Sequence, residues 1–253
     1  MDTIKAFIGT CAQRGFCGPR LHELVPTVDT EDCDEVRSEF LSVERVPDIL
    51  DYLRNYHRAS RQHVVFELMW HTMIRISGVR ALDLSHYDSD EGFVEVVNQP
   101  ETGTRLKNGD SSERFIGLST DICGVIDEYI DVGRENVADE FGRDPLITTE
   151  YGRPASSTIR QDVYQVTYPP FIGQDCSCPS CDTHDRNSAF RCNDTRSPHM
   201  VRKASVIHHR DAGWDPLMVA DRADASWDVL SKHYDLATKK EKMLRRKDNI
   251  DDL

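Results

Sequence analysis

The chain has 253 residues, of which 38% are hydrophobic, and this composition suits a folded globular protein and excludes an intrinsically disordered one. The sequence has no apolar run of about 18 residues and no export signal at its start, so we expect a cytoplasmic protein without a membrane span. A net charge of −13 argues at face value against a polyanionic partner such as nucleic acid. However, Arg outnumbers Lys 23 to 8, and the guanidinium group is well suited to bind phosphate.

The first part of the chain is too short to form a domain of its own. Residues 1–35 carry one short helical pattern, around residues 4–11, and then a segment rich in Gly, Pro and acidic residues that is typical of a linker. Residues 36–253 are therefore expected to form the main domain.

Helical periodicity dominates the main domain. Apolar residues recur at helical spacing over residues 46–57, 60–76, 119–133, 157–168, 199–213, 215–223 and 226–247. Two short β-rich runs, residues 93–99 and 113–118, flank a turn-forming segment and predict an antiparallel hairpin with Lys107 beside its turn. The predicted fold class is mainly α with a small antiparallel β-sheet (α+β).

Two local arrangements of charged residues could hold a phosphate. His199 and Arg202 stand three residues apart at a predicted helix start marked by Ser197 and Pro198, where the helix dipole is positive. Arg80 is predicted to begin a short helical turn in which Asp83 can orient its guanidinium. Each arrangement also occurs as an ordinary surface pair.

The order of these residues and their surroundings resemble the tyrosine recombinase (phage integrase) family from about residue 35 to the end. RISGVRALDLSHYD resembles its first arginine motif (Arg80, Asp83), and TRLKNGDSSERFIGL resembles the hairpin that carries its lysine (Lys107). SPHMVRKASVIHHRDAG is similar to its His-x-x-Arg motif, which gives His199 and Arg202, with His208 as a supporting or helix-packing residue. WDVLSKHYDLATKKEKM resembles the segment that carries the nucleophile, here Tyr234.

The resemblance implies a function, a mechanism and a partner. The chain would have the tyrosine recombinase catalytic domain fold and act as a site-specific recombinase or integrase on double-stranded DNA, as a homotetramer, through a 3′-phosphotyrosyl intermediate and without a catalytic cofactor. Residues 1–35 would be the remnant helix and linker of an N-terminal core-binding domain. The segment from DPLMVADRA to KHYD is most like integrases of halophilic archaea, which would explain the acidic surface. One departure is Ala225, where the family usually has His or Trp.

A cysteine-rich insert at residues 169–198 is not explained by the resemblance. Cys176, Cys178, Cys181 and Cys192 fall close together with His184 between them, and this density suits a structural zinc ion. Reduced thiols in an exposed loop are the alternative.

Three other functions remain open from the sequence. A relative that binds DNA without cutting it would agree with Ala225 and the short N-terminus. A type IB topoisomerase-like activity would use the same chemistry as a recombinase. A zinc-dependent interaction module would make the insert, and not Tyr234, the functional centre.

Overall fold

The computed structural model describes residues 2–25, 40–177, 186–226 and 229–230. The chain divides into two compact units, Met1–Ser38 and Glu39–Leu253, close to the predicted boundary at residue 35. Among the described residues there is no helix of the length and apolar character needed to cross a membrane.

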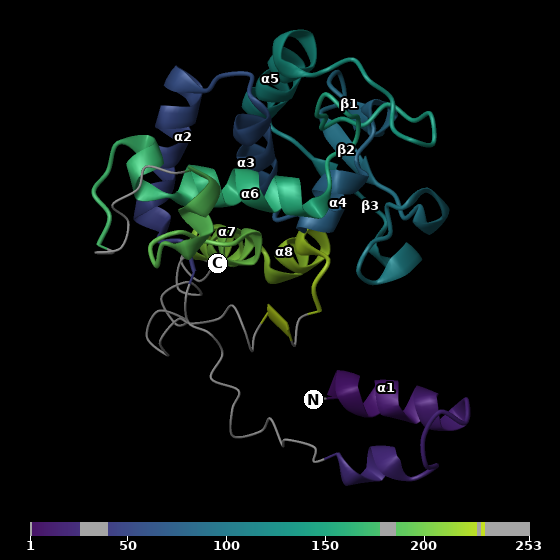
Figure 1. Ribbon diagram of the computed structural model, residues 1–253. Helices are drawn as coiled ribbons and strands as arrows, with labels where there is room; N and C mark the ends of the chain where they lie inside the picture. The colour runs from purple at the N-terminus through teal and green to yellow at the C-terminus, as the bar shows by residue number, and fades with distance from the viewer. Residues whose placement is uncertain (1, 26–39, 178–185, 227–228, 231–253) are drawn as a thin grey trace, which may run out of the picture. The chain divides into compact units, whose positions relative to one another are not determined.

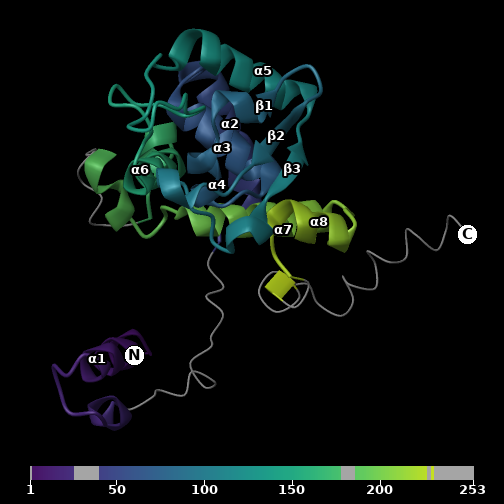
Figure 2. The ribbon, with the colours of Figure 1, turned by 90° about the vertical axis from the view of Figure 1, so that its right-hand side faces the viewer.

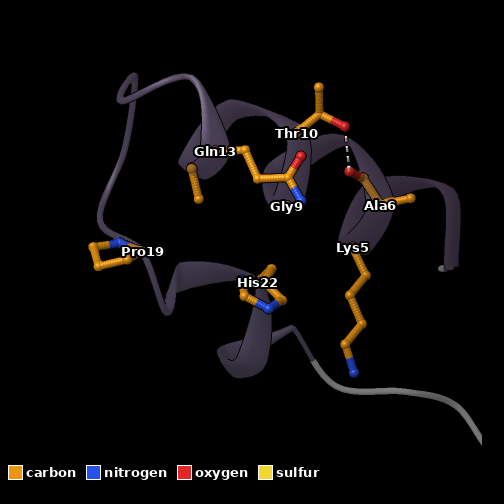
Figure 3. A pocket seen from close by; sticks show the side chains of 8 residues that line it. Lys5, Ala6, Gly9, Thr10, Gln13, Pro19 and His22 are labelled. Atoms are coloured by element: carbon orange, nitrogen blue, oxygen red, sulfur yellow. Dashed lines mark hydrogen bonds between the residues drawn. The ribbon is translucent and has the colours of Figure 1, made fainter.

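The first unit contains a helix and a turn. Helix α1 (Asp2–Gln13) is longer than the sequence predicts, and the 3-10 turn η1 (Leu21–Leu24) follows it. A hollow of about 560 Å³ lies between these two elements, lined among others by Lys5, Gln13 and His22 (Figure 3). That this unit is the remnant of a core-binding domain stays a prediction.

The second unit is mainly helical, as predicted. Its helices are α2 (Val46–Tyr56), α3 (Arg61–Thr72), α4 (Ile76–Ala81), α5 (Thr120–Glu128), α6 (Ser156–Thr167), α7 (Pro198–Asp211) and α8 (Pro216–Ala223). Short turns connect them: η3 (Val43–Arg45), η4 (Leu84–His86), η5 (Pro100–Thr102), η6 (Gly109–Ser112), the π-helical η7 (Tyr129–Gly133), η8 (Pro169–Ile172) and η9 (Arg186–Arg191). In Figures 1 and 2 α7 and α8 lie side by side along one edge of the unit.

The predicted hairpin is present and forms part of a three-stranded antiparallel sheet. Strands β1 (Tyr87–Asp88), β2 (Phe93–Val96) and β3 (Arg114–Gly117) stand in that order. Val94 pairs with Ile116, and both side chains are buried on the face that joins the core. Lys107 lies in the long connection from β2 to β3, and it lines a crevice together with Val96 of β2 and Arg114 of β3.

Polar side chains begin three helices where the sequence places cap residues. The Ser60 hydroxyl accepts a hydrogen bond from the His63 N–H at the start of α3, and Ser197 accepts from the Met200 N–H at the start of α7. Asp215 accepts from the Leu217 and Met218 N–H groups at the start of α8. Each cap satisfies backbone donors that the helix leaves unpaired.

The continuous helix predicted over residues 60–76 is wrong. Helix α3 ends at Thr72, and Met73 takes a left-handed backbone conformation with φ of +56°, so the chain turns before α4 begins at Ile76. The apolar period continues through this turn because Met73 and Ile74 are themselves fully buried. At these positions the apolar periodicity therefore reflects burial and does not indicate a continuing helix.

Two hydrophobic clusters hold the second unit together. The larger joins α2 to α6 and the sheet, around the almost completely buried α3. It also takes in Phe171, Ile172, Ala189 and Cys192, so the insert contributes core residues that its irregular sequence pattern did not reveal. The smaller cluster joins the end of α3 to α7 and α8 through Met73, Val206, Ile207, Val219, Ala223 and Leu230.

Candidate active site

The start of α7 presents two of the predicted site residues at different depths. His199 reaches the surface, whereas Arg202, almost one helical turn later, is only 2% exposed. The Arg202 guanidinium donates hydrogen bonds to the carbonyl oxygens of Met73 and Ala223, which are the ends of α3 and α8. Two fixed acceptors therefore set the orientation of this buried cation.

Positive charges surround His199. Desolvation by the protein beneath the ring is the main cause that lowers the His199 pKa below its usual value, and the charges of Arg202, Lys203, Lys107 and Arg75 lower it further. The imidazole is therefore held in its neutral form at pH 7, in which one ring nitrogen can accept a proton. We call His199 and these four cations the cation cluster.

The residues of the cation cluster come from distant parts of the chain. Arg75 lies in the turn between α3 and α4, Lys107 in the β2–β3 connection, and the other three residues in α7. A small crevice between the first two is lined by Arg75, Lys107, Ser112, Arg114 and Asp224, among others. Like charges destabilise one another at short range, so this concentration on a chain of net charge −13 marks a place suited to an anion.

One carboxylate fixes Arg75 within the cluster. Asp224 follows α8 in a left-handed conformation with φ of +49°, and its carboxylate forms an ion pair with Arg75. The same carboxylate accepts hydrogen bonds from the Ser112 hydroxyl, at 2.7 Å, and from the Asn108 amide, at 3.3 Å. Asp224 thereby connects the end of α8, the turn before α4 and the connection that carries Lys107.

A groove adjoins this contact on the side of α8. Its volume is about 370 Å³. It runs between the β2–β3 connection, at Asn108 and Ser111, with Arg114 at the start of β3, and the end of α8, at Asp224 and Ala225. Ala225, which stands where the family usually has His or Trp, therefore lines the groove beside Asp224. The groove shares Arg114 and Asp224 with the crevice that Arg75 and Lys107 line.

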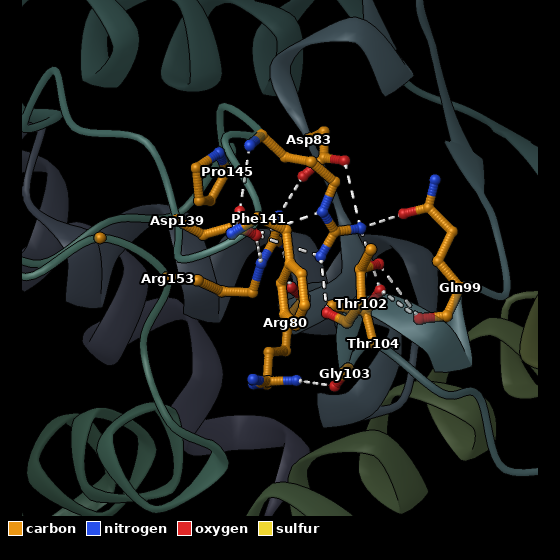
Figure 4. Close-up of polar contacts among 12 residues, drawn as sticks. Arg80, Asp83, Gln99, Thr102, Gly103, Thr104, Asp139, Phe141, Pro145 and Arg153 are labelled. Carbon is orange, nitrogen blue, oxygen red and sulfur yellow. Dashed lines mark hydrogen bonds and ion pairs between the residues drawn. The ribbon is translucent and has the colours of Figure 1, made fainter.

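Arg80 lies in a different environment. It belongs to the last turn of α4 and does not begin a new one, as the sequence suggested, and its guanidinium donates to the carbonyls of Pro154, at 3.0 Å, and Gly103. Figure 4 shows this side chain directed to Gly103 and away from Asp83. The expected pairing of Asp83 with Arg80 is thus wrong.

Asp83 pairs instead with two arginines from a later loop. Arg153 binds both Asp83 and Asp139, and Arg143 lies 3.1 Å from Asp139 and 3.6 Å from Asp83 (Figure 4). Arg153 also donates to the backbone carbonyl of Arg80, at 2.7 Å. We call these four charged residues the aspartate network. It fastens the loop from Asp139 to Arg153 against the end of α4.

His208 packs within the helical framework. Its ring lies 5.2 Å from that of Trp70 on α3, which agrees with the helix-packing role considered for it. The neighbouring His209 is buried, and this burial lowers its pKa to about 4.

Three predicted site residues, Tyr234, Cys178 and Cys181, lie outside the described residues. The chain can be followed to Leu230, which is fully buried in the smaller cluster with Met73 and Ala223. The carbonyls of those two residues are the ones that hold Arg202. The described chain therefore ends close to the predicted phosphate site.

Several solved structures have a fold similar to that of this chain. The integrase of transposon Tn1549, in complex with a circular intermediate DNA, matches with a TM-score of 0.65 over 97% of this chain and 76% of its own, at 15% identity. The XerA recombinase matches with a TM-score of 0.60, at 11% identity, over 97% of this chain and 73% of its own. The fold is that of a tyrosine recombinase catalytic domain.

A third match supports the same fold. A lambda integrase dimer bound to a core site has a TM-score of 0.57 and 12% identity over 94% of this chain and 72% of its own. No protein-family model matches the sequence, and no curated protein is similar enough in sequence to match. The likeness therefore lies in the three-dimensional structure.

Sequence reasoning missed Arg75 and Asp224. Arg75 stands five positions before Arg80 in RISGVR, but it has no acid three residues later, and this was the signal that favoured Arg80. Asp224 is the immediate neighbour of Ala225, the position already noted as unusual. The unusual residue at position 225 was the available signal that the side chain next to it, Asp224, could make a contact at the site.

Proposed function

We propose that the protein is a tyrosine-type site-specific recombinase that cuts and rejoins DNA strands through a covalent 3′-phosphotyrosyl intermediate at Tyr234. The observation that carries the proposal is the convergence of Arg75, Lys107, His199 and Arg202 in a recombinase fold. The similar solved structures support the fold, and the enzyme activity is proposed from the residues of the cation cluster.

Arg75 and Arg202 are proposed to bind the scissile phosphate. The pentavalent transition state concentrates negative charge on the non-bridging oxygens, and preorganised guanidinium groups stabilise that charge. Arg75, held by Asp224, takes the role that the sequence motif suggested for Arg80. Arg80 is bound to two backbone carbonyls in another part of the fold.

Proton transfer is assigned to His199 and Lys107. A phenol has a pKa of about 10 and needs a proton acceptor at neutral pH, and the neutral His199 imidazole can accept the Tyr234 proton. As the tyrosine oxygen bonds to phosphorus, the bond to the 5′-oxygen breaks and Lys107 protonates that oxygen. The reverse steps rejoin the strand, so no ATP is consumed.

The position of Leu230 is compatible with Tyr234 as the nucleophile. Tyr234 follows Leu230 by four residues, and four residues span at most about 14 Å. The buried Leu230 is packed with Met73 and Ala223, beside the Arg202 contacts. A tyrosine within about 14 Å of Leu230 supports the role proposed for Tyr234.

Double-stranded DNA is the proposed partner, with a homotetramer as the proposed assembly. Solved structures of the Tn1549 integrase and lambda integrase with the same fold contain DNA. A net charge of −13 does not prevent DNA binding, because binding depends on the local surface that contacts the phosphates, and that surface here carries the cation cluster. The acidic remainder suits a protein that works in concentrated salt, as the resemblance to halophilic integrases implies.

The test is covalent capture on a nicked suicide duplex, in low and in high salt. The expected result is a protein–DNA adduct on a denaturing gel that is absent from Tyr234→Phe and present in Tyr56→Phe, a variant of an exposed tyrosine on α2. Bound DNA without an adduct under any condition would contradict the proposal and favour a catalytically inactive DNA-binding protein.

A further inference from the structure

Two cysteines of the insert, separated by sixteen positions in the sequence, meet in space. The Cys176 and Cys192 sulfurs lie 3.1 Å apart. Cys192 is 5% exposed and belongs to the larger hydrophobic cluster, while Cys176 packs against that cluster. With the Asp194 carboxylate they form the one group of three metal-ligating side chains found in the part of the chain that the structure describes.

The surroundings of the two sulfurs suit metal ligands. The backbone N–H of Asp194 points to the Cys192 sulfur at 3.4 Å, an interaction that favours a thiolate. The Asp194 carboxylate accepts from both the backbone N–H and the hydroxyl of Ser177, each at 2.7 Å, and so fixes the residue next to Cys176. Such second contacts orient the ligands of a metal.

The same segment is anchored to the framework of the domain. Arg45 donates to the backbone carbonyls of Asp194, at 3.0 Å, and Thr167, at 2.9 Å. The Arg196 N–H then donates to the Thr167 hydroxyl, and Ser197 begins α7 directly afterwards. A cross-link between Cys176 and Cys192 would therefore fix the chain that leads into the helix of His199 and Arg202.

We infer that Cys176 and Cys192 are two thiolate ligands of a structural zinc ion and that Asp194 is a positioning residue for them. Zinc–sulfur bonds of about 2.3 Å place two tetrahedral ligands ~3.8 Å apart, so an ion requires the sulfurs to separate by ~0.7 Å. Cys178, Cys181 and His184, which the sequence places between the two cysteines, lie outside the described residues. The inference concerns stability of the domain and is independent of the proposed cleavage chemistry.

The experiment measures zinc in the full chain, purified under reducing conditions. Elemental analysis is expected to give one zinc per chain, and cobalt substitution is expected to give the visible and near-ultraviolet bands of a tetrahedral thiolate site. Cys176→Ser should lose the zinc, and Cys123→Ser, a variant of another buried cysteine on α5, should retain it. Asp194→Asn should bind zinc about 10 to 100 times more weakly, since it alters only the support of a ligand.

Two results would overturn the inference. Zinc-free protein with all cysteines titrating as thiols would show an ordinary reduced loop. A mass two hydrogens lower, with Cys176 linked to Cys192 in a peptide map, would show a disulfide. If Cys176→Ser fails to fold, chelation of zinc from the wild-type protein replaces it: a fall in the thermal midpoint that added zinc restores supports the site, and an unchanged midpoint contradicts it. None of these readouts depends on DNA cleavage.

Discussion

The two arginine-containing clusters differ in how their charges are balanced. In the aspartate network, Arg143 and Arg153 meet Asp83 and Asp139, so the charges compensate one another inside the fold. In the cation cluster, five basic residues lie together with Asp224 as the acidic partner of Arg75. Paired opposite charges hold a loop in place, whereas like charges held close together repel one another, and an anionic ligand relieves that repulsion.

The largest expected effect is on stability and comes from the aspartate network. Arg153→Met leaves Asp83 and Asp139 without their main partner in a site where all three side chains are nearly buried. We expect the free energy of unfolding, measured with denaturant, to fall by about 3–5 kcal/mol. The control Arg160→Met, on the exposed face of α6, should change it by less than about 0.5 kcal/mol. An equal loss of stability in the two variants would show that the ion pairs of Arg153 do not stabilise the fold.

The next effect separates the two candidate arginines by cleavage rate. Arg75→Ala removes a preorganised cation from the proposed phosphate site, which should slow single-turnover adduct formation by about 10²-fold or more. Arg80→Ala removes bonds to two backbone carbonyls and should slow it by less than about 10-fold, with a loss of stability of about 1–2 kcal/mol. A greater loss of rate in Arg80→Ala would return the catalytic role to the residue that the sequence motif favoured.

A smaller effect is expected from the carboxylate that holds Arg75. Asp224→Asn suits the left-handed backbone and keeps an oxygen for the Ser112 hydroxyl, but it removes the negative charge opposite Arg75. We expect cleavage about 10-fold slower with DNA affinity equal or higher, because one negative charge leaves a phosphate site. Asp221→Asn, an exposed residue of α8, is the matched control. A joint loss of DNA binding and rate would show that Asp224 supports the fold and not Arg75.

The smallest effect is a shift in the pH dependence of cleavage. A pKa of His199 below its usual value keeps the proton acceptor neutral to a lower pH than an ordinary histidine would, so the acid limb of the rate should lie below the ordinary histidine pKa. Lys203→Met removes one neighbouring positive charge, which raises the His199 pKa and moves the acid limb to higher pH. The shift is expected to be small, because Lys203 is one of four charges that act on His199 and desolvation is the larger cause of the lowered pKa. An unmoved acid limb would exclude His199 as the titrating group.

Much of the fold was predictable because local rules were sufficient. Ser197 and Pro198 mark the start of α7, and the alternation around Val94 and Ile116 marks the hairpin, since capping and pleating depend on near neighbours. The break at Met73 was not predictable, because a buried turn continues the apolar pattern of the helix before it. The core positions of Phe171 and Ala189 were missed because their segment has no period.

The sequence by itself determined the helical class of the domain, the sheet, the residue pair at the start of α7 and the cysteine density of the insert. It could not decide between Arg75 and Arg80, because both stand in one short motif and spacing to an acid is the only local difference between them. The tertiary structure decided where each lies, since the turn at Met73 carries Arg75 to Asp224 and Lys107 while α4 carries Arg80 to Gly103 and Pro154. Pairing across the chain depends on how the helices pack, and a local pattern does not contain that information.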